Sequence, residues 1–106
     1  MGLAACFGSE TDFLQGTWET HDVHVFDSWT FDGGEFAHAT GNRMNVPNLL
    51  SGRFQIIEKD GQKLTVELYD LDGQFLFEDT SEIVIHIDQE AETIQIGGKT
   101  FTRLHP

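Results

Sequence analysis

The chain of 106 residues contains a single cysteine, two prolines and only six basic residues. One cysteine, Cys6, excludes an internal disulfide, so apolar packing must hold the fold together. Six Lys and Arg against eighteen Asp and Glu give a formal net charge of −12. That balance disfavours nucleic acid and anionic membranes as partners, because both attract clustered basic residues. No apolar run approaches the roughly 20 residues of a transmembrane helix, so no transmembrane segment is expected.

The sequence also lacks the patterns that would indicate an enzyme, a metal or a cofactor. It has no Gly-x-Ser-x-Gly nucleophile motif, no phosphate-binding loop and no pair of cysteines. His21 and His24 are three residues apart, a spacing that points strand residues to opposite faces. Segment 70–73 resembles the start of a calcium loop, but Ser81 stands where the final glutamate is needed. We therefore expect no catalytic residues, no metal and no cofactor.

What the chain does contain is a series of short segments in which apolar and polar residues alternate. About eight or nine such segments follow one another, with turns every 8–12 residues or so, a spacing typical of sandwiches and barrels. Glycine-containing turns are expected at 32–34, 59–62, 70–73 and 97–98. The residues expected to face inward, as core or pocket wall, are Phe54, Ile56, Leu64, Val66, Leu68, Ile83, Ile85 and Ile87.

The region before these segments predicts a short helix and then the first strand. Ser9, followed three residues later by Asp12, has the form of a helix N-cap, and Gly16 would end the helix after about one turn. The first strand is expected over residues 17–26. The fold class predicted is all-β: a small antiparallel up-and-down barrel, because closure removes the exposed strand edges that invite aggregation.

Two short motifs resemble those of lipocalins and of related small lipocalin-like bacterial domains. Leu14-Gln15-Gly16-Thr17-Trp18 has the Gly-x-Trp form that follows a short helical turn in that family. Arg103, on the expected last strand, matches the arginine that packs over this tryptophan, and segment 51–66 has a similar rhythm. The resemblance implies structural roles for Gly16, Trp18 and Arg103 at the closed end of a barrel. Because the chain is shorter than a lipocalin, it also implies a shallow or filled calyx.

A second resemblance lies at the N-terminus, where Leu3-Ala4-Ala5-Cys6 is similar to the lipobox of bacterial lipoproteins. In that motif the cysteine thiol takes the lipid. The basic and apolar parts of a signal peptide do not precede it, so two alternatives stay open. Either Cys6 anchors the protein in the bacterial envelope, on the periplasmic side, or the match is accidental and the protein is cytoplasmic. Residues 1–12 are expected to form a tether, and residues 13–106 the barrel domain.

Two functions are compatible with these features. The first is a non-enzymatic binding or accessory protein that holds a small apolar ligand or acts structurally. The second is an acidic inhibitor of a basic envelope enzyme, such as a protease or lysozyme, since opposite charge speeds association. The residues expected at a pocket mouth are Asp22, His24 and His38. Those expected in an apolar contact loop over 42–50 are Met44, Val46, Leu49 and Leu50.

Overall fold

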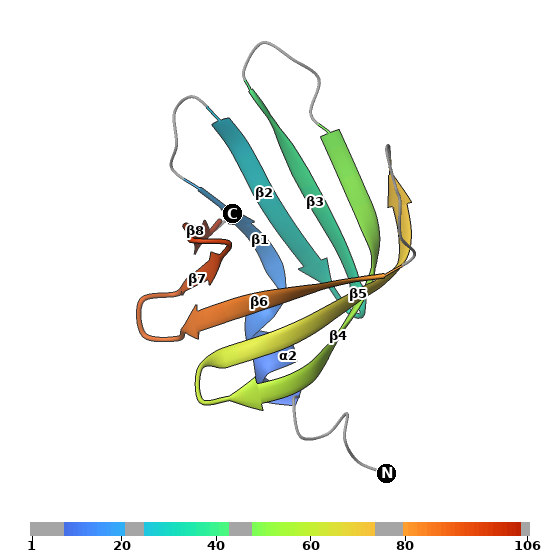
Figure 1. The fold of residues 1–106 in the computed structure, drawn as a ribbon. Helices are drawn as coiled ribbons and strands as arrows, with labels where there is room; N and C mark the ends of the chain where they lie inside the picture. Colours follow the sequence, from blue (N-terminus) through green and yellow to red (C-terminus); the bar gives the residue numbers. More distant parts are fainter. Residues whose placement is uncertain (1–7, 21–24, 43–47, 74–79, 105–106) are drawn as a thin grey trace.

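The computed structural model describes residues 8–20, 25–42, 48–73 and 80–104 (Figure 1). Across these residues, eight antiparallel strands form one closed barrel, in which each strand pairs with the next and the last pairs with the first. The predicted up-and-down barrel is confirmed. Its elements are α2 (Gly8–Leu14), β1 (Gly16–Glu19), β2 (Val25–Asp32), β3 (Glu35–Asn42), β4 (Asn48–Asp60), β5 (Lys63–Gly73), β6 (Ser81–Asp88), β7 (Thr93–Ile96) and β8 (Lys99–Arg103).

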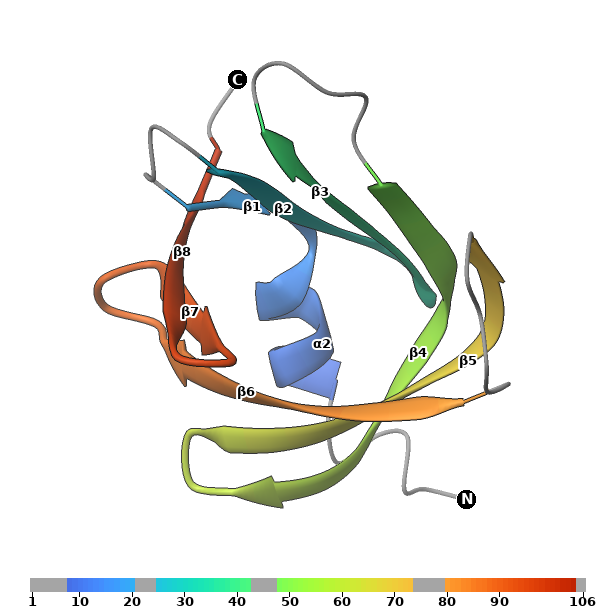
Figure 2. The same ribbon diagram turned by 45° about the horizontal axis from the view of Figure 1, so that its top comes forward.

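Helix α2 lies at one end of the barrel, within the outline of the strands in Figure 2. The side chain of Gln15 binds this end to the β2–β3 turn: its Oε1 accepts from the Gly33 N–H at 2.7 Å. Gly16 has a φ of 117°, a conformation open mainly to glycine, and so lets the chain turn directly from α2 into β1. We call this the closed end of the barrel. The opposite end, which carries the β7–β8 turn at Gly97 and Gly98, is the open end.

The structure corrects the expectation of one strand over 17–26. β1 ends at Glu19, and Val25 already belongs to β2, which runs antiparallel to β1 with Trp18 opposite Trp29. The prediction failed because alternation of apolar and polar residues continues across the reversal and no glycine or proline marks it.

The turn expected over 70–73 is also wrong, because these residues lie within β5. Asp70 adopts a φ of 51°, which aspartate tolerates better than most residues, and the β4–β5 register shifts between Ser51 and Arg53. A Cβ on the intervening Gly52 would come within 2.7 Å of the Tyr69 carbonyl oxygen. The glycine therefore permits a close backbone approach, and the chain bends without leaving the sheet.

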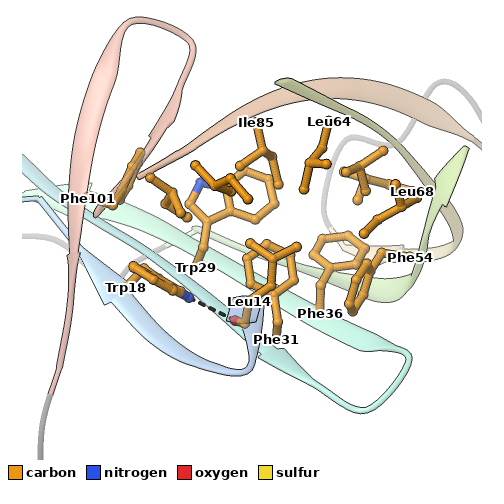
Figure 3. Packing of buried hydrophobic residues seen from close by; sticks show 14 residues of the cluster. Leu14, Trp18, Trp29, Phe31, Phe36, Phe54, Leu64, Leu68, Ile85 and Phe101 are labelled. Carbon is orange, nitrogen blue, oxygen red and sulfur yellow. Dashed lines mark hydrogen bonds between the residues drawn. The ribbon is translucent and has the colours of Figure 1, made fainter. Parts of the chain in front are cut away.

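The buried apolar side chains of the strands and of α2 form one cluster inside the barrel (Figure 3). Phe31 packs edge-on against Phe54 at a centroid distance of 5.0 Å. All eight residues predicted to face inward belong to this core, with Ile83 partly buried at its margin. Its fully buried members are Leu14, Trp18, Phe31, Leu64, Val66, Leu68, Ile85, Ile94 and Phe101. Side chains this inaccessible fill the part of the barrel that they occupy, as in a packed protein core.

Candidate functional site

The inward-facing positions of three strands change from apolar to polar towards the open end. Along β2, Phe31 and Trp29 are followed by Asp27, and along β8, Phe101 is followed by Lys99. On β3, Phe36 is followed in the same way by a histidine, His38. Because alternate residues of a strand share one face, these polar side chains extend the wall that the core residues begin. On these three strands the inner wall is thus apolar near the closed end and polar near the open end.

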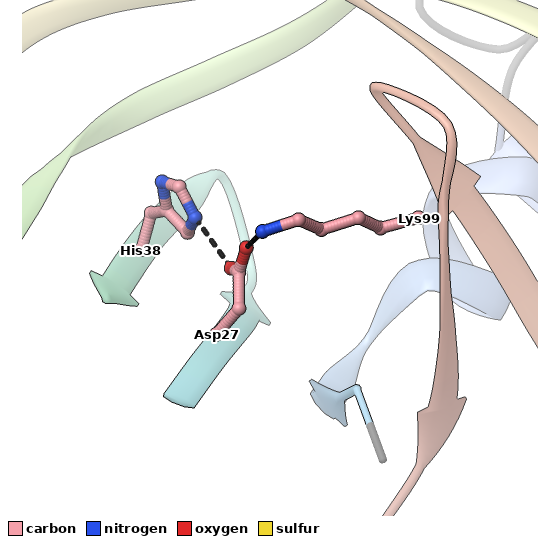
Figure 4. A network of polar contacts seen from close by, with 3 residues as sticks. All are labelled: Asp27, His38 and Lys99. Atoms are coloured by element: carbon pink, nitrogen blue, oxygen red, sulfur yellow. Dashed lines mark hydrogen bonds and ion pairs between the residues drawn. The ribbon is translucent and has the colours of Figure 1, made fainter. Parts of the chain in front are cut away.

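The three polar side chains meet in one cluster, although they come from β2, β3 and β8 (Figure 4). Asp27 Oδ1 lies 2.7 Å from His38 Nε2, and Asp27 Oδ2 accepts from Lys99 Nζ at 3.0 Å. The carboxylate is therefore bonded through both oxygens, one to each partner. We call these three residues the Asp27 cluster.

Exposure rises through the Asp27 cluster in a regular order. The side chain of Asp27 is 7% exposed, that of His38 is 23% exposed and that of Lys99 is 53% exposed. The imidazole of His38 stacks on the indole of Trp29, with centroids 3.9 Å apart and planes inclined by 13°. The cluster thus presents hydrogen-bonding groups to solvent, and the Trp29 ring packs beneath it. Such an arrangement can fix the orientation of a small ligand.

Only some of the residues predicted for a site are placed here. His38 lies on the inner wall near the open end, whereas Asp22 and His24 fall outside the described residues. Met44, Val46 and Cys6 also fall outside them. The contact loop expected over 42–50 is shorter than predicted, since β4 begins at Asn48.

Leu49 and Leu50 both belong to β4 and therefore point to opposite faces of the sheet. Leu49 is 57% exposed on the outside, whereas Leu50 packs against the core. The two leucines cannot serve one contact surface together, and of the pair only Leu49 faces solvent.

Sequence reasoning missed Asp27 and Lys99 as site residues. Asp27 precedes Trp29 and Phe31 at the spacing of one strand face, and Lys99 precedes Phe101 in the same way. The spacing predicts that both side chains face inward. Asp27 was missed because the predicted first strand ended at residue 26, which left Asp27 between two strands. Their meeting could not be read from the sequence, because it depends on how β8, β1 and β2 close the barrel.

At the closed end, Trp18 and Arg103 make the predicted contact. They are direct cross-strand partners, and the guanidinium carbon lies 4.3 Å from the centroid of the Trp18 ring. The same guanidinium donates to the carbonyl oxygens of Phe13 and Gln15, at the C-terminal side of α2. Trp18 is itself fully buried, and its Nε1 donates to the Leu14 carbonyl at 2.8 Å. These contacts join the first strand, the last strand and the helix.

A buried carboxylate fixes the other end of α2. Glu10 forms an ion pair with Lys59 of β4, and its Oε2 accepts from the Ser9 hydroxyl at 2.6 Å. The hydrogen bond from Lys59 is the main cause that lowers the pKa of Glu10 below its ordinary value of 4.5. The expected boundary between tether and domain, at residue 12, falls inside α2, and Glu10 on its tether side is buried against the barrel.

The fold and the Asp27 cluster define the class: a small closed β-barrel with a polar cluster in its open end. Comparison of the chain with known protein families, curated proteins and solved structures found no match. Within the described ranges, no three His, Cys, Asp or Glu side chains lie close enough to hold a metal ion. No helix in the part of the chain that the structure describes is long and apolar enough to cross a membrane.

Proposed function

We propose that this protein is a non-enzymatic binding module that takes a small, largely apolar molecule at the open end of its barrel. The observation that carries the proposal is the Asp27 cluster, which lies on the inner wall directly beyond the aromatic core. A barrel wall that is apolar towards the closed end and carries hydrogen-bonding groups at the open end matches the usual composition of a ligand site.

The energetics of the Asp27 cluster support a role beyond stability. Burying the Asp27 carboxylate, whose side chain is 7% exposed, costs free energy that its ion pair with Lys99 only partly offsets, and an apolar residue of similar size is often as stabilising. The core next to the cluster already contains such residues, among them Trp29 and Phe36. A polar cluster at this place is therefore better explained by recognition than by folding, because a few placed polar groups beside an apolar wall are what orients a ligand.

The packing of the core limits where the ligand can lie. Phe31 and Phe101 are 1% exposed, so the closed half of the barrel has no free space around these side chains. The ligand is expected to be shallow and to lie over His38 and Trp29. This agrees with the filled or shallow calyx implied by the lipocalin resemblance, which also favours binding over catalysis. A lipid anchor at Cys6, and with it an envelope location, belongs to the same proposal.

The first test uses N-phenyl-1-naphthylamine, a neutral apolar dye whose fluorescence rises in an apolar site. The protein should bind the dye saturably, and His38→Ala should weaken binding about fivefold, the equivalent of roughly 1 kcal/mol of lost contact. His86→Ala is the matched control, because His86 is an exposed histidine on β6. Absence of saturable binding, or equal effects of both variants, would contradict the proposal.

The acidic surface favours a second candidate, an inhibitor that binds a basic protein. Three basic side chains, Lys59, Lys99 and Arg103, are engaged by the chain's own carboxylates or carbonyls. Their positive charge is thus offset internally, and the surface is left with an excess of carboxylates. Leu49, which is 57% exposed on β4, would be an anchor for such a partner.

A further inference from the structure

We infer that the ligand of the open end carries an anionic oxygen group, such as a carboxylate, that the Lys99 ammonium receives. Asp27 acts as a positioning residue that holds this ammonium. The inference rests on the proposed function and specifies the chemistry of its ligand.

The first step concerns the polar atoms that the cluster leaves for a ligand. Both oxygens of Asp27 are already bonded within the cluster. The Lys99 ammonium has three donors and gives one of them to Asp27, so two remain on a side chain that is 53% exposed. His38 Nε2 is taken up by Asp27. The free charged donors of the cluster are therefore those of Lys99, and their complement is an acceptor.

The second step concerns the alternatives. A wholly apolar ligand lying over the cluster would strip water from Lys99 and replace it with nothing, which is costly for a charged group. A cationic ligand would have to displace Lys99 from Asp27 before it gained an acceptor. An anionic oxygen avoids both costs. It replaces the water around the Lys99 ammonium with a hydrogen bond, and the ion pair between Lys99 and Asp27 stays intact. Hydrogen bonds between charged partners are also the stronger ones.

The net charge of −12 acts against this ligand at long range and in favour of a cation. At physiological salt the screening length is about 8 Å, so exposed charges further away than this contribute little to the bound state. The contact at Lys99 therefore decides the preference among head groups. Measurements are best made at an ionic strength of about 0.15 M, where this condition holds.

The experiment compares three compounds that share one apolar body and differ in the head group: 2-naphthoate, 2-naphthalenemethanol and 2-naphthylmethylamine. Each is titrated against the protein by displacement of N-phenyl-1-naphthylamine. We expect naphthoate to bind about tenfold more tightly than the alcohol, since about 1.4 kcal/mol separates them, and the amine to bind most weakly. Equal affinities, or preference for the amine, would overturn the inference while leaving the proposed function standing. If the dye binds but none of the three compounds displaces it, the inference fails alone; if the dye does not bind, the proposed function fails as well.

The role of Lys99 is tested by Lys99→Met, which keeps the length of the side chain and removes its charge. The variant should lose most of the tenfold preference for naphthoate, with the alcohol affected less than twofold, and Lys99→Arg should restore it. Lys63→Met, at an exposed lysine on β5, is the control. Thermal melting verifies that each variant is folded, and Lys99→Gln replaces any variant that is not. A preference unchanged in Lys99→Met would assign the cluster a structural role only.

Discussion

Arg103 shows what one planar side chain can do that a lysine cannot. Its guanidinium lies over the Trp18 ring and at the same time donates to two carbonyl oxygens at the end of α2. The Phe13 carbonyl lies in the last turn of α2, where no N–H of the helix binds it, and the Gln15 carbonyl directly follows the helix. A fork of five donors on a flat cation satisfies both requirements at once, whereas an ammonium offers only a point charge.

At this residue scale, we predict that Trp18 and Arg103 are energetically coupled. Trp18→Ala should lower the free energy of unfolding by about 3–5 kcal/mol, as for other buried aromatics, and Arg103→Ala by less. In the double mutant the losses should fall short of additivity by about 0.5–2 kcal/mol, since the first substitution already removes the shared contact. Denaturant unfolding of the four proteins measures this coupling.

Arg53 provides the control for that cycle, because it lies over Tyr69 at 5.8 Å on an exposed part of the sheet. Arg53→Ala should cost well under about 1 kcal/mol and should add independently to Trp18→Ala. Additive losses for Trp18 and Arg103 as well would mean that the closed end does not depend on their contact.

At the scale of elements, α2 is stable only because of what it packs against. A helix of seven residues cannot persist alone in water, since its nucleation cost exceeds what so few hydrogen bonds return. Leu14 inserts its fully buried side chain into the core, and Glu10 is held by Lys59. One apolar and one ionic contact thus fasten the helix over the closed end.

The ion pair of Glu10 makes the stability of the protein depend on pH. Its pKa is lowered in the folded state, so the unfolded chain binds the proton more readily. The contribution is complete above the ordinary pKa of 4.5 and is lost as pH falls through the lower folded value. Glu10→Gln should therefore reduce stability near pH 7 and flatten the part of the pH profile that lies below 4.5. Denaturant unfolding between neutral and acidic pH gives both profiles.

Glu58→Gln, at an exposed position of the same strand as Lys59, is the control for this prediction. It should leave the acid part of the profile parallel to that of the wild type. Profiles of the wild type and Glu10→Gln that run parallel throughout would show that Glu10 does not contribute to acid sensitivity.

How much of each element the sequence predicts depends on how its ends are marked. The β4–β5 hairpin is marked by Asp60-Gly61, and the β7–β8 turn by two glycines, so both were predictable. The reversal between β1 and β2 carries no such mark. The bend at Asp70 carries a misleading turn signal, because the nearby Gly73 suggested a turn where the strand only bulges. Local turn chemistry was thus informative only where the chain leaves the sheet.

At the scale of the whole molecule, closure was predictable because the Gly-x-Trp motif and Arg103 imply that the first and last strands meet. The Asp27 cluster was not, because its members come from three strands and are brought together by tertiary register. Lys99 and Asp27 are 72 residues apart in the sequence. Their strands, β8 and β2, are both paired with β1 nearer the closed end, and the two side chains meet beyond the end of β1. No local pattern in the sequence contains that geometry.

The net charge of −12 is also a property of the whole molecule, and within the described sheet it leaves carboxylates in direct opposition at two places, Asp32 opposite Glu35 and Glu67 opposite Glu82. Glu67 of β5 faces Glu82 of β6 across the sheet, and Glu67 accepts a hydrogen bond from the Gln55 side-chain amide at 2.7 Å. Like charges at opposed positions destabilise a strand pair, and the excess negative charge adds repulsion over the rest of the surface.

We predict that Glu82→Lys raises the free energy of unfolding by about 0.2–1 kcal/mol, because it turns an opposed like-charge pair into an attractive one. The gain should shrink as salt is raised from about 0.01 M to 1 M, since the screening length falls from about 30 Å to 3 Å. Asp60→Lys is the opposite control: Asp60 faces Lys63 across β4 and β5, so the substitution should destabilise by a similar amount. Thermal and denaturant unfolding at low and high salt measure both effects. If both substitutions stabilise alike, the total charge of the molecule governs stability; if the signs differ as predicted, the opposed pairs govern it.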